Sequence, residues 1–115
     1  MGNKPPDRVE LLQGTLDVLI LRTLLGEPKH GHAIAKHIQR TSEELLQVET
    51  GSLYPALHRL EAKGWLSASW ELSDKGKRAR YYRLTPQGRK QLTIEQSKWE
   101  TFSRAVGLVM RPAEE

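Results

Sequence analysis

The chain has 115 residues, which predicts a single domain, and its 37% hydrophobic and 28% charged residues are typical of a soluble globular protein. It has no cysteine, which excludes disulfides and thiolate metal sites. No run approaches the roughly 18 apolar residues of a membrane span, and the polar start MGNKPPDRVE lacks a signal-peptide core. We therefore expect a cytoplasmic protein without a membrane partner.

The net charge of +4 is unevenly distributed. Residues 1–50 hold six Lys and Arg against seven Asp and Glu, whereas residues 51–115 hold twelve against seven. From Asp74 to Lys90 there are seven basic residues and one acidic residue. Such a concentration favours a polyanionic partner such as DNA, although a solvated basic loop is the alternative.

Residues 1–9 are predicted to form a flexible arm, since Pro5, Pro6 and scattered charges offer nothing to pack. A helix follows, and Gly26 and Pro28 end it. This helix has two apolar sides and must therefore be buried on both. The first side consists of Leu12, Leu16, Leu19, Ile20 and Thr23, and the second of Val18, Leu21 and Leu25.

A second helix is predicted over residues 31–42, with Ala33, Ile34 and Ile38 facing inward. The connector at 43–50 contributes Leu45, Leu46 and Val48 to the core.

A third helix is predicted within residues 50–66. Leu53, Leu57 and Leu60 lie on one side of it, and the opposite side carries Ser52, Pro55, His58, Arg59 and Ala62. A proline is tolerated only in the first turn of a helix, which favours Ser52 as the N-cap. A start at Thr50 would sacrifice one hydrogen bond. Gly64 is expected to end the helix.

Two short strands, WLSASWELS and RYYRLT, flank a turn at Lys75–Gly76 and predict a β-hairpin. Trp65 and Trp70 are expected to pack in the core and on the strands, and one of Tyr81 and Tyr82 should face the core. Thr85 then caps a long helix over residues 86–110, with Pro86 at its first position. Residues 111–115 are a polar tail.

Three helices, a basic hairpin and a long helix make a mainly α protein, with the plan of a winged helix-turn-helix over residues 10–85 followed by a C-terminal dimerisation helix at 86–110. The third helix is short enough to enter a major groove, which is roughly 12 Å wide. Lys75, Lys77, Arg78 and Arg80 at the hairpin tip would reach flanking phosphates, where neutralisation releases counterions.

Four segments resemble the PadR family of bacterial transcriptional regulators: LLQGTLDVLILRTLL, HGHAIAKHI, VETGSLYPALHRLEAKGWL and KRARYYRLTPQGRKQL. The resemblance covers about residues 10–92. It implies a homodimeric winged-helix repressor that binds a pseudo-palindromic operator in double-stranded DNA. In many members a small aromatic or drug-like effector releases the DNA. The single terminal helix resembles the smaller subclass.

By position, the resemblance implies DNA contacts from the third helix and the wing, at Ser52, Tyr54, His58, Arg59, Lys63, Lys77, Arg78 and Arg80. Tyr54 is alternatively a half-buried packing residue, and Arg59 holds either a guanine or a phosphate.

We further infer that Val18, Leu21 and Leu25 pack against the terminal helix of a second chain. The apolar stripe Leu92, Trp99, Phe102 and Val106 would otherwise be exposed. In drug-binding members of the resembling family, aromatic residues of the terminal helices line a cleft between subunits. Trp99 is therefore the candidate effector contact, and packing within the dimer core is the alternative.

Other functions have less support. A protein-interaction module built on a winged-helix scaffold is the alternative to a DNA reader, and a MarR-type regulator would carry longer flanking helices. The sequence has no phosphate-binding glycine loop and no plausible catalytic triad, so we expect no enzyme and no cofactor. His30, His32 and His37 have no matching carboxylate or cysteine arrangement, so we expect no metal site.

Overall fold

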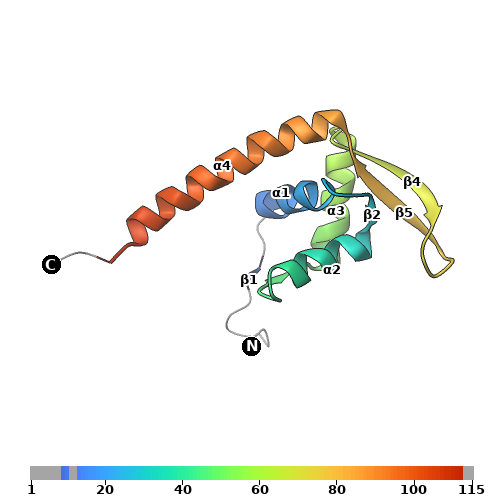
Figure 1. Ribbon diagram of the computed structural model, residues 1–115, viewed down its shortest axis with the longest axis horizontal. Helices are drawn as coiled ribbons and strands as arrows, with labels where there is room; N and C mark the ends of the chain where they lie inside the picture. The colour runs from blue at the N-terminus through green and yellow to red at the C-terminus, as the bar shows by residue number, and fades with distance from the viewer. Residues whose placement is uncertain (1–8, 11–12, 113–115) are drawn as a thin grey trace.

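The computed structural model describes residues 9–10 and 13–112. Three helices, α1 (Gln13–Thr23), α2 (Gly31–Thr41) and α3 (Thr50–Ala62), precede the hairpin of β4 (Leu66–Leu72) and β5 (Arg78–Leu84), and α4 (Pro86–Met110) ends the fold (Figure 1). This order confirms the predicted winged helix-turn-helix with a long terminal helix. Three parts of the sequence prediction lie outside the described residues: the arm at 1–9 except for Val9, the stripe residue Leu12, and the end of the tail at 113–115.

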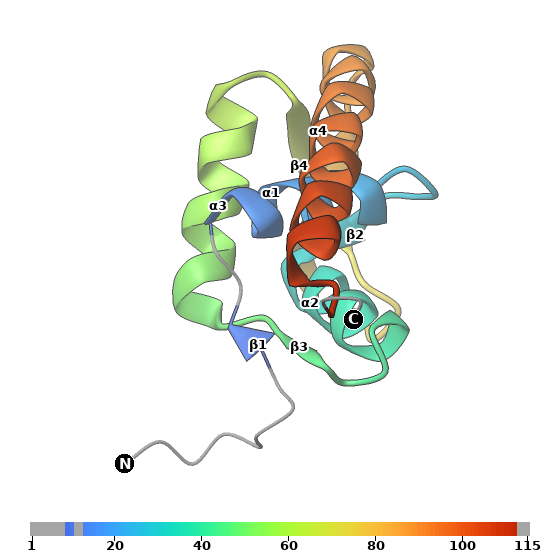
Figure 2. The same ribbon diagram turned by 90° about the vertical axis from the view of Figure 1, so that its left-hand side faces the viewer.

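The core lies where α1, α2 and α3 meet the base of the hairpin. It is built from Leu and Ile side chains together with Ala56 and Tyr82, and α4 adds Leu92. The predicted inward positions Leu53, Leu57 and Leu60 are all buried. α1 lies between α3 and α4 and contacts both, so part of each of its two apolar sides is covered within the chain (Figure 2).

This arrangement changes the expected dimer surface. Leu21 has no exposed surface and Leu92 is 4% exposed, so both belong to the core of the protomer itself and offer almost no area to a second chain. The sequence pattern correctly indicated that both apolar sides of α1 need a packing partner. At Leu21, however, that partner is the chain's own core and not a second chain.

The predicted Ser52 cap of α3 is wrong. The helix begins at Thr50 with Glu49 as its N-cap, and the Glu49 carbonyl accepts hydrogen bonds from the backbone N–H groups of Ser52 (3.0 Å) and Leu53 (2.9 Å). Pro55 therefore lies inside the helix and cannot donate to the Gly51 carbonyl. Pro55 and Gly51 are exposed, so water can satisfy that carbonyl. Beyond Ala62, Gly64 adopts a φ of 79° and ends the helix as expected.

Short strands that the sequence did not predict join the elements. β2 (Lys29–His30) pairs antiparallel with Tyr82 and Tyr81 and makes the hairpin a three-stranded sheet of order β2-β5-β4. β1 (Val9–Glu10) pairs in parallel with β3 (Leu46–Gln47). In the connector, Glu43 and Glu44 adopt φ values of 55° and 66°, which cost a non-glycine residue about 1–2 kcal/mol each.

The base of α4 is fixed to the turn between α3 and β4. Thr85 caps the helix as predicted: its Oγ1 accepts from the Gly88 N–H (2.9 Å) and donates to the Gly64 carbonyl (2.7 Å). Gly88 lies against the Trp65 carbonyl so closely that an added Cβ would be 2.1 Å from its oxygen. From this base α4 extends away from the core (Figure 1). Among the described residues, no helix has both the length and the apolar character to span a bilayer.

Candidate nucleic-acid interface

The exposed side of α3 is small and polar. Ser52, Pro55 and His58 are all exposed, as is Ala62 nearer the end of the helix. Buried leucines hold the opposite side, so the orientation of α3 is fixed by the core. A helix of this kind can approach the edges of bases without a bulky side chain holding it away.

Tyr54 spans the gap between α3 and the start of α2. Its ring lies on Gly31, where an added Cβ would be 2.7 Å from the hydroxyl oxygen, and 38% of the residue is exposed. Its surroundings therefore suit both interpretations given above: the ring packs, while part of the side chain remains accessible at the surface.

Arg59 does not project freely from α3. Its Nη2 donates to Asp17 Oδ1 of α1 at 2.6 Å, and its Nε is buried without a hydrogen-bond partner among the described residues. The expectation of an outward Arg59 is therefore wrong for this conformation. Arg59 lies at the edge of the polar side of α3, and the Asp17 carboxylate on α1 turns its guanidinium toward α1.

Lys63 and the hairpin provide the exposed cations. Lys63 lies at the C-cap of α3, with its Nζ 4.7 Å from the centroid of the Trp65 ring. The hairpin tip is closed by hydrogen bonds from the Ser73 N–H to the Lys77 carbonyl (2.7 Å) and from the Gly76 N–H to the Ser73 carbonyl (2.9 Å). Gly76 has a φ of 76°, as this tight turn requires. Lys77 and Arg78 are exposed beside it.

Arg80, another predicted DNA contact, links the wing to α3. Its Nη2 donates to Glu61 Oε2 at 2.8 Å, and both side chains are about one third exposed. The wing is thereby tied to the last turn of α3, which sets the position of one relative to the other.

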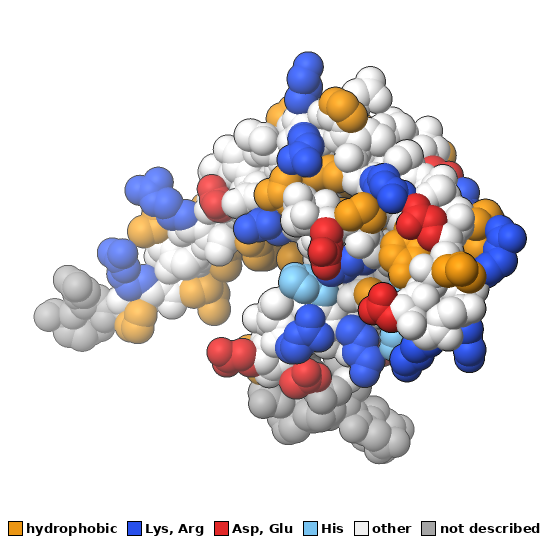
Figure 3. Space-filling view, turned by 45° about the vertical axis from the view of Figure 1, so that its right-hand side comes forward, with side chains coloured by type: hydrophobic (Ala, Val, Ile, Leu, Met, Phe, Trp, Pro, Cys, Tyr) orange, Lys and Arg blue, Asp and Glu red, His pale blue; other side chains and the backbone are white. Residues whose placement is uncertain are grey.

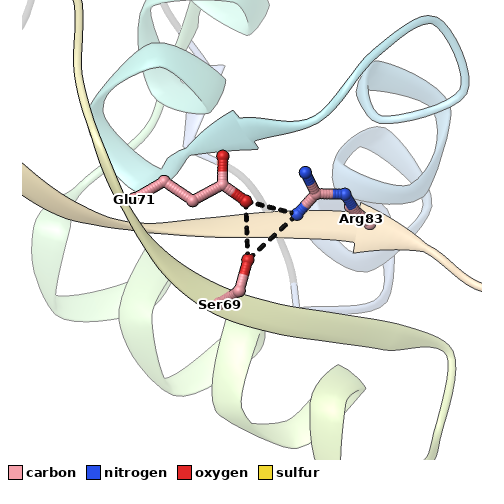
Figure 4. A network of polar contacts seen from close by, with 3 residues as sticks. All are labelled: Ser69, Glu71 and Arg83. Carbon is pink, nitrogen blue, oxygen red and sulfur yellow. Dashed lines mark hydrogen bonds and ion pairs between the residues drawn. The ribbon is translucent and has the colours of Figure 1, made fainter.

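A separate polar network lies farther along the sheet (Figure 4). Arg83 Nη1 contacts Glu71 Oε2 at 2.8 Å and donates to Ser69 Oγ at 3.0 Å, while Ser69 Oγ donates to the same carboxylate at 2.7 Å. The hydrogen bonds from Arg83 and Ser69 lower the pKa of Glu71. The positive charge of Arg83 is thus neutralised locally.

A cleft of about 520 Å³ separates the wing from the starts of α2 and α3. Basic and aromatic side chains gather around it, with one carboxylate, Asp74. The lining residues are His30, Gly31, His32, Tyr54, Trp70, Ser73, Asp74, Lys75, Lys77, Arg78, Ala79, Arg80, Tyr81 and Tyr82. Of the predicted DNA contacts, the structure brings Tyr54, Lys77, Arg78 and Arg80 together here, whereas Ser52, His58, Arg59 and Lys63 lie elsewhere on α3 or at its end.

Sequence reasoning missed the position of Trp70 in this cleft. It was expected to pack on the strands, yet it is 60% exposed. Tyr82 is buried and Tyr81 half-buried, which confirms that one of the pair faces the core.

The far half of α4 exposes apolar side chains. Trp99 (46%), Phe102 (60%) and Val106 are exposed, and the rings of Trp99 and Phe102 lie 6.1 Å apart. Between α4 and α1 a groove of about 320 Å³ is lined by Gly14, Thr15, Val18, Glu95, Lys98, Trp99 and Phe102. Val18 and Leu25 are only partly buried.

Within residues 13–112 no group of three His, Asp or Glu side chains is placed to hold a metal ion. His30 instead caps α2, where its Nδ1 accepts a hydrogen bond from the Ala33 N–H at 3.1 Å.

Three helices around a leucine core, followed by a basic hairpin beside the third helix, define the class of winged helix-turn-helix proteins. The model of the PadR-like family of transcriptional regulators matches residues 20–94. The transcriptional regulator Rv3488 of Mycobacterium tuberculosis is 34% identical over 97 residues, which cover 84% of this chain and 87% of that protein.

Solved structures give the same result. A transcriptional regulator from Clostridium thermocellum superposes with a TM-score of 0.78 at 29% identity, covering 86% of this chain and 96% of that one. A PadR family regulator from Clostridium difficile has a TM-score of 0.72 at 28% identity, covering 84% and 98%. The chain belongs to the PadR-like family of transcriptional regulators, and this membership implies DNA binding.

Proposed function

We propose that the chain is a homodimeric repressor that binds a pseudo-palindromic operator in duplex DNA. In this proposal residues 10–85 form the DNA-binding domain and residues 86–110 the dimerisation helix. The observation that carries it is the small, exposed side of α3 lying beside a wing whose Lys77 and Arg78 are also exposed. α3 would enter the major groove, while the wing would neutralise flanking phosphates.

The apolar surface of α4 supports the dimer. Trp99, Phe102 and Val106 lie at helical spacing on one side of α4, and Trp99 and Phe102 line a groove together with Val18 of α1. Contiguous exposed apolar surface is typical of an association site. A two-fold axis through it would place two recognition helices about one DNA turn apart, roughly 34 Å, which fits an inverted repeat.

We also propose that a planar effector regulates DNA binding from the groove beside Trp99. The groove combines an exposed indole with a neighbouring phenyl ring, and such rings stack on planar ligands. Titration with planar compounds should quench tryptophan fluorescence in the unmodified chain. A Trp99→Ala variant that binds the same compounds unchanged would exclude the site and leave packing in the dimer core as the role of Trp99.

The operator is tested by selecting bound duplexes from a random pool and mapping the result onto the promoter of the protein's own gene. Recovery of an inverted repeat supports the proposal. Binding that lacks both sequence preference and salt dependence would favour a protein-interaction module instead. We place this activity in the cytoplasm and attribute no catalysis to it.

A further inference from the structure

Trp70 and Leu72 are large apolar residues of the wing that the core does not use. They continue the alternating pattern of β4, in which Leu66 is buried and Ala68 half-buried. Trp70 is 60% and Leu72 69% exposed, because the hairpin extends beyond the helices that cover its base (Figure 1). Trp70 and Leu72 lie on the same side of β4 and together form an exposed apolar patch, which is the kind of surface that indicates a contact site.

Arginines lie directly beside these side chains. In the strand register Trp70 pairs with Arg80 and Leu72 pairs with Arg78. The guanidinium carbon of Arg78 is 5.7 Å from the centroid of the Trp70 ring. Among the described residues no carboxylate lies within salt-bridge distance of Arg78, whereas Arg80 is held by Glu61. One exposed indole thus lies beside a guanidinium that no carboxylate of residues 13–112 neutralises.

Trp70 and Arg78 both line the cleft between the wing and Tyr54. β2 pairs only with Tyr81 and Tyr82, so the edge of β5 from Arg78 to Arg80 is left open beside the cleft. The lining includes four Lys and Arg residues and one Asp, which favours an anionic occupant. Figure 3 shows hydrophobic side chains among Lys and Arg, together with some Asp and Glu, on the side of the molecule where the wing lies.

Resting on the proposed function, we propose that Trp70 and Arg78 form a DNA contact that reads no base. The indole packs against deoxyribose, and the guanidinium holds the adjoining phosphate. With α3 in the major groove, the backbone strand next to it runs past the wing and through this cleft. The sugar offers C–H surface to the indole, and the phosphate supplies the charge that complements Arg78.

Salt dependence separates the two parts of this contact. Binding of a fluorescein-labelled, mixed-sequence duplex of about 30 base pairs, roughly three turns, is followed by anisotropy at several salt concentrations. Trp70→Ala should weaken binding by about fivefold, the effect of losing about 40 Å² of apolar contact, with an unchanged slope of log K against log salt. Arg78→Ala should weaken binding and reduce the slope by about 0.9, the loss of one phosphate contact.

Arg83→Ala is the matched control, because it removes the same charge from the same hairpin at a position already neutralised by Glu71. It should leave the slope unchanged. Trp70→Phe should recover part of the affinity. Thermal unfolding of each variant verifies the fold, which an exposed Trp70 should not influence strongly.

The possible failures are distinguishable. If the unmodified chain binds neither this duplex nor any duplex selected from the random pool, the proposed function fails and this inference fails with it. If the unmodified chain binds and Trp70→Ala binds equally well, only the Trp70 contact is overturned. Equal loss of slope in Arg78→Ala and Arg83→Ala would overturn the assignment of Arg78 to this cleft.

Discussion

At the scale of single residues, Gly88 shows how little space some positions leave. A side chain there would meet the Trp65 carbonyl oxygen at 2.1 Å and Leu84 Cδ1 at 2.8 Å. We expect Gly88→Ala to lower the free energy of unfolding by about 2 kcal/mol or more, because a backbone carbonyl cannot move aside cheaply. Urea unfolding at fixed protein concentration measures the change.

Gly107 is the matched control for Gly88. It lies in the same helix, and an added Cβ would meet nothing within 4 Å. Gly107→Ala should therefore stabilise the protein by about 0.5–1 kcal/mol through helix propensity. If both substitutions changed stability equally, the close approach at Gly88 would not be the cause.

His37 makes stability depend on pH. Burial, followed by the charges of Lys29, Arg40 and Arg22, lowers its pKa from the ordinary value of 6.5. The unfolded chain therefore binds a proton more readily than the folded one. The stability contribution of a neutral His37 is fully present above about pH 6.5 and is lost as the pH falls through the folded-state pKa.

His37→Gln should flatten this part of the stability profile. Urea unfolding of both proteins from about pH 8 to about pH 5 makes the comparison, and the difference at the alkaline end gives the effect of the substitution itself. Two parallel profiles would show that another group is responsible for the loss of stability in acid.

Arg59 and Trp70 mark where residue-level prediction stopped. Helical periodicity correctly predicted that Leu53, Leu57 and Leu60 of α3 are buried, because those residues lie at the centre of its apolar side. Arg59 lies at the margin, and its direction is decided by Asp17, which is 42 positions away in the sequence. The alternating pattern of β4 places Trp70 on the same side as the buried Leu66. Trp70 is nevertheless exposed, because the hairpin extends beyond the core at that position.

At the scale of elements, the ion pair between Arg59 and Asp17 ties α3 to α1. Arg59 and Asp17 side chains are 29% and 17% exposed, so their ion pair is less screened than a surface pair. A double-mutant cycle with Arg59→Ala and Asp17→Ala should give a coupling free energy of about 1 kcal/mol or more.

An exposed pair in the same chain provides the comparison. Lys98 and Glu95 of α4 are 3.9 Å apart, and Lys98 is 70% exposed. Their coupling should stay at or below about 0.5 kcal/mol. Equal coupling in the two cycles would mean that Arg59–Asp17 contributes no more than an ordinary surface pair.

The elements were predictable to different degrees. Helical periodicity and turn residues located the helices and the hairpin, and Thr85–Pro86 marked the start of α4. The start of α3 could not be predicted, because the helix tolerates Pro55 where its backbone faces solvent. The two-residue strands β1, β2 and β3 have no sequence pattern of their own, since they form only when distant segments meet.

At the scale of the whole molecule, the apolar side of α4 predicts the oligomeric state. Phe102→Glu would place a charge in the proposed interface, where desolvation opposes association. We expect this variant to elute as a monomer in size-exclusion chromatography with light scattering at micromolar concentration, whereas the unmodified chain elutes as a dimer.

Ser97→Glu adds the same charge two positions from Trp99, on another side of the helix, and should leave the dimer intact. An unmodified chain that is a stable folded monomer under these conditions would contradict the proposed dimer. Sequence alone indicated this surface through Trp99, Phe102 and Val106, but assigned it Leu21 and Leu92, because a linear pattern does not show which apolar positions the protomer itself covers.

The close contact of Gly88 with the Trp65 carbonyl has a mechanical consequence. It fixes the first turn of α4 to the junction of α3 and the wing, so we expect α4 to move together with them as one rigid unit. α4 continues without interruption to Met110, a length of roughly 37 Å at about 1.5 Å per residue. A tilt of about 10° at its far end therefore displaces the near end by roughly 6 Å. In a dimer joined through α4, a small change in crossing angle becomes a large change in the spacing of two recognition helices.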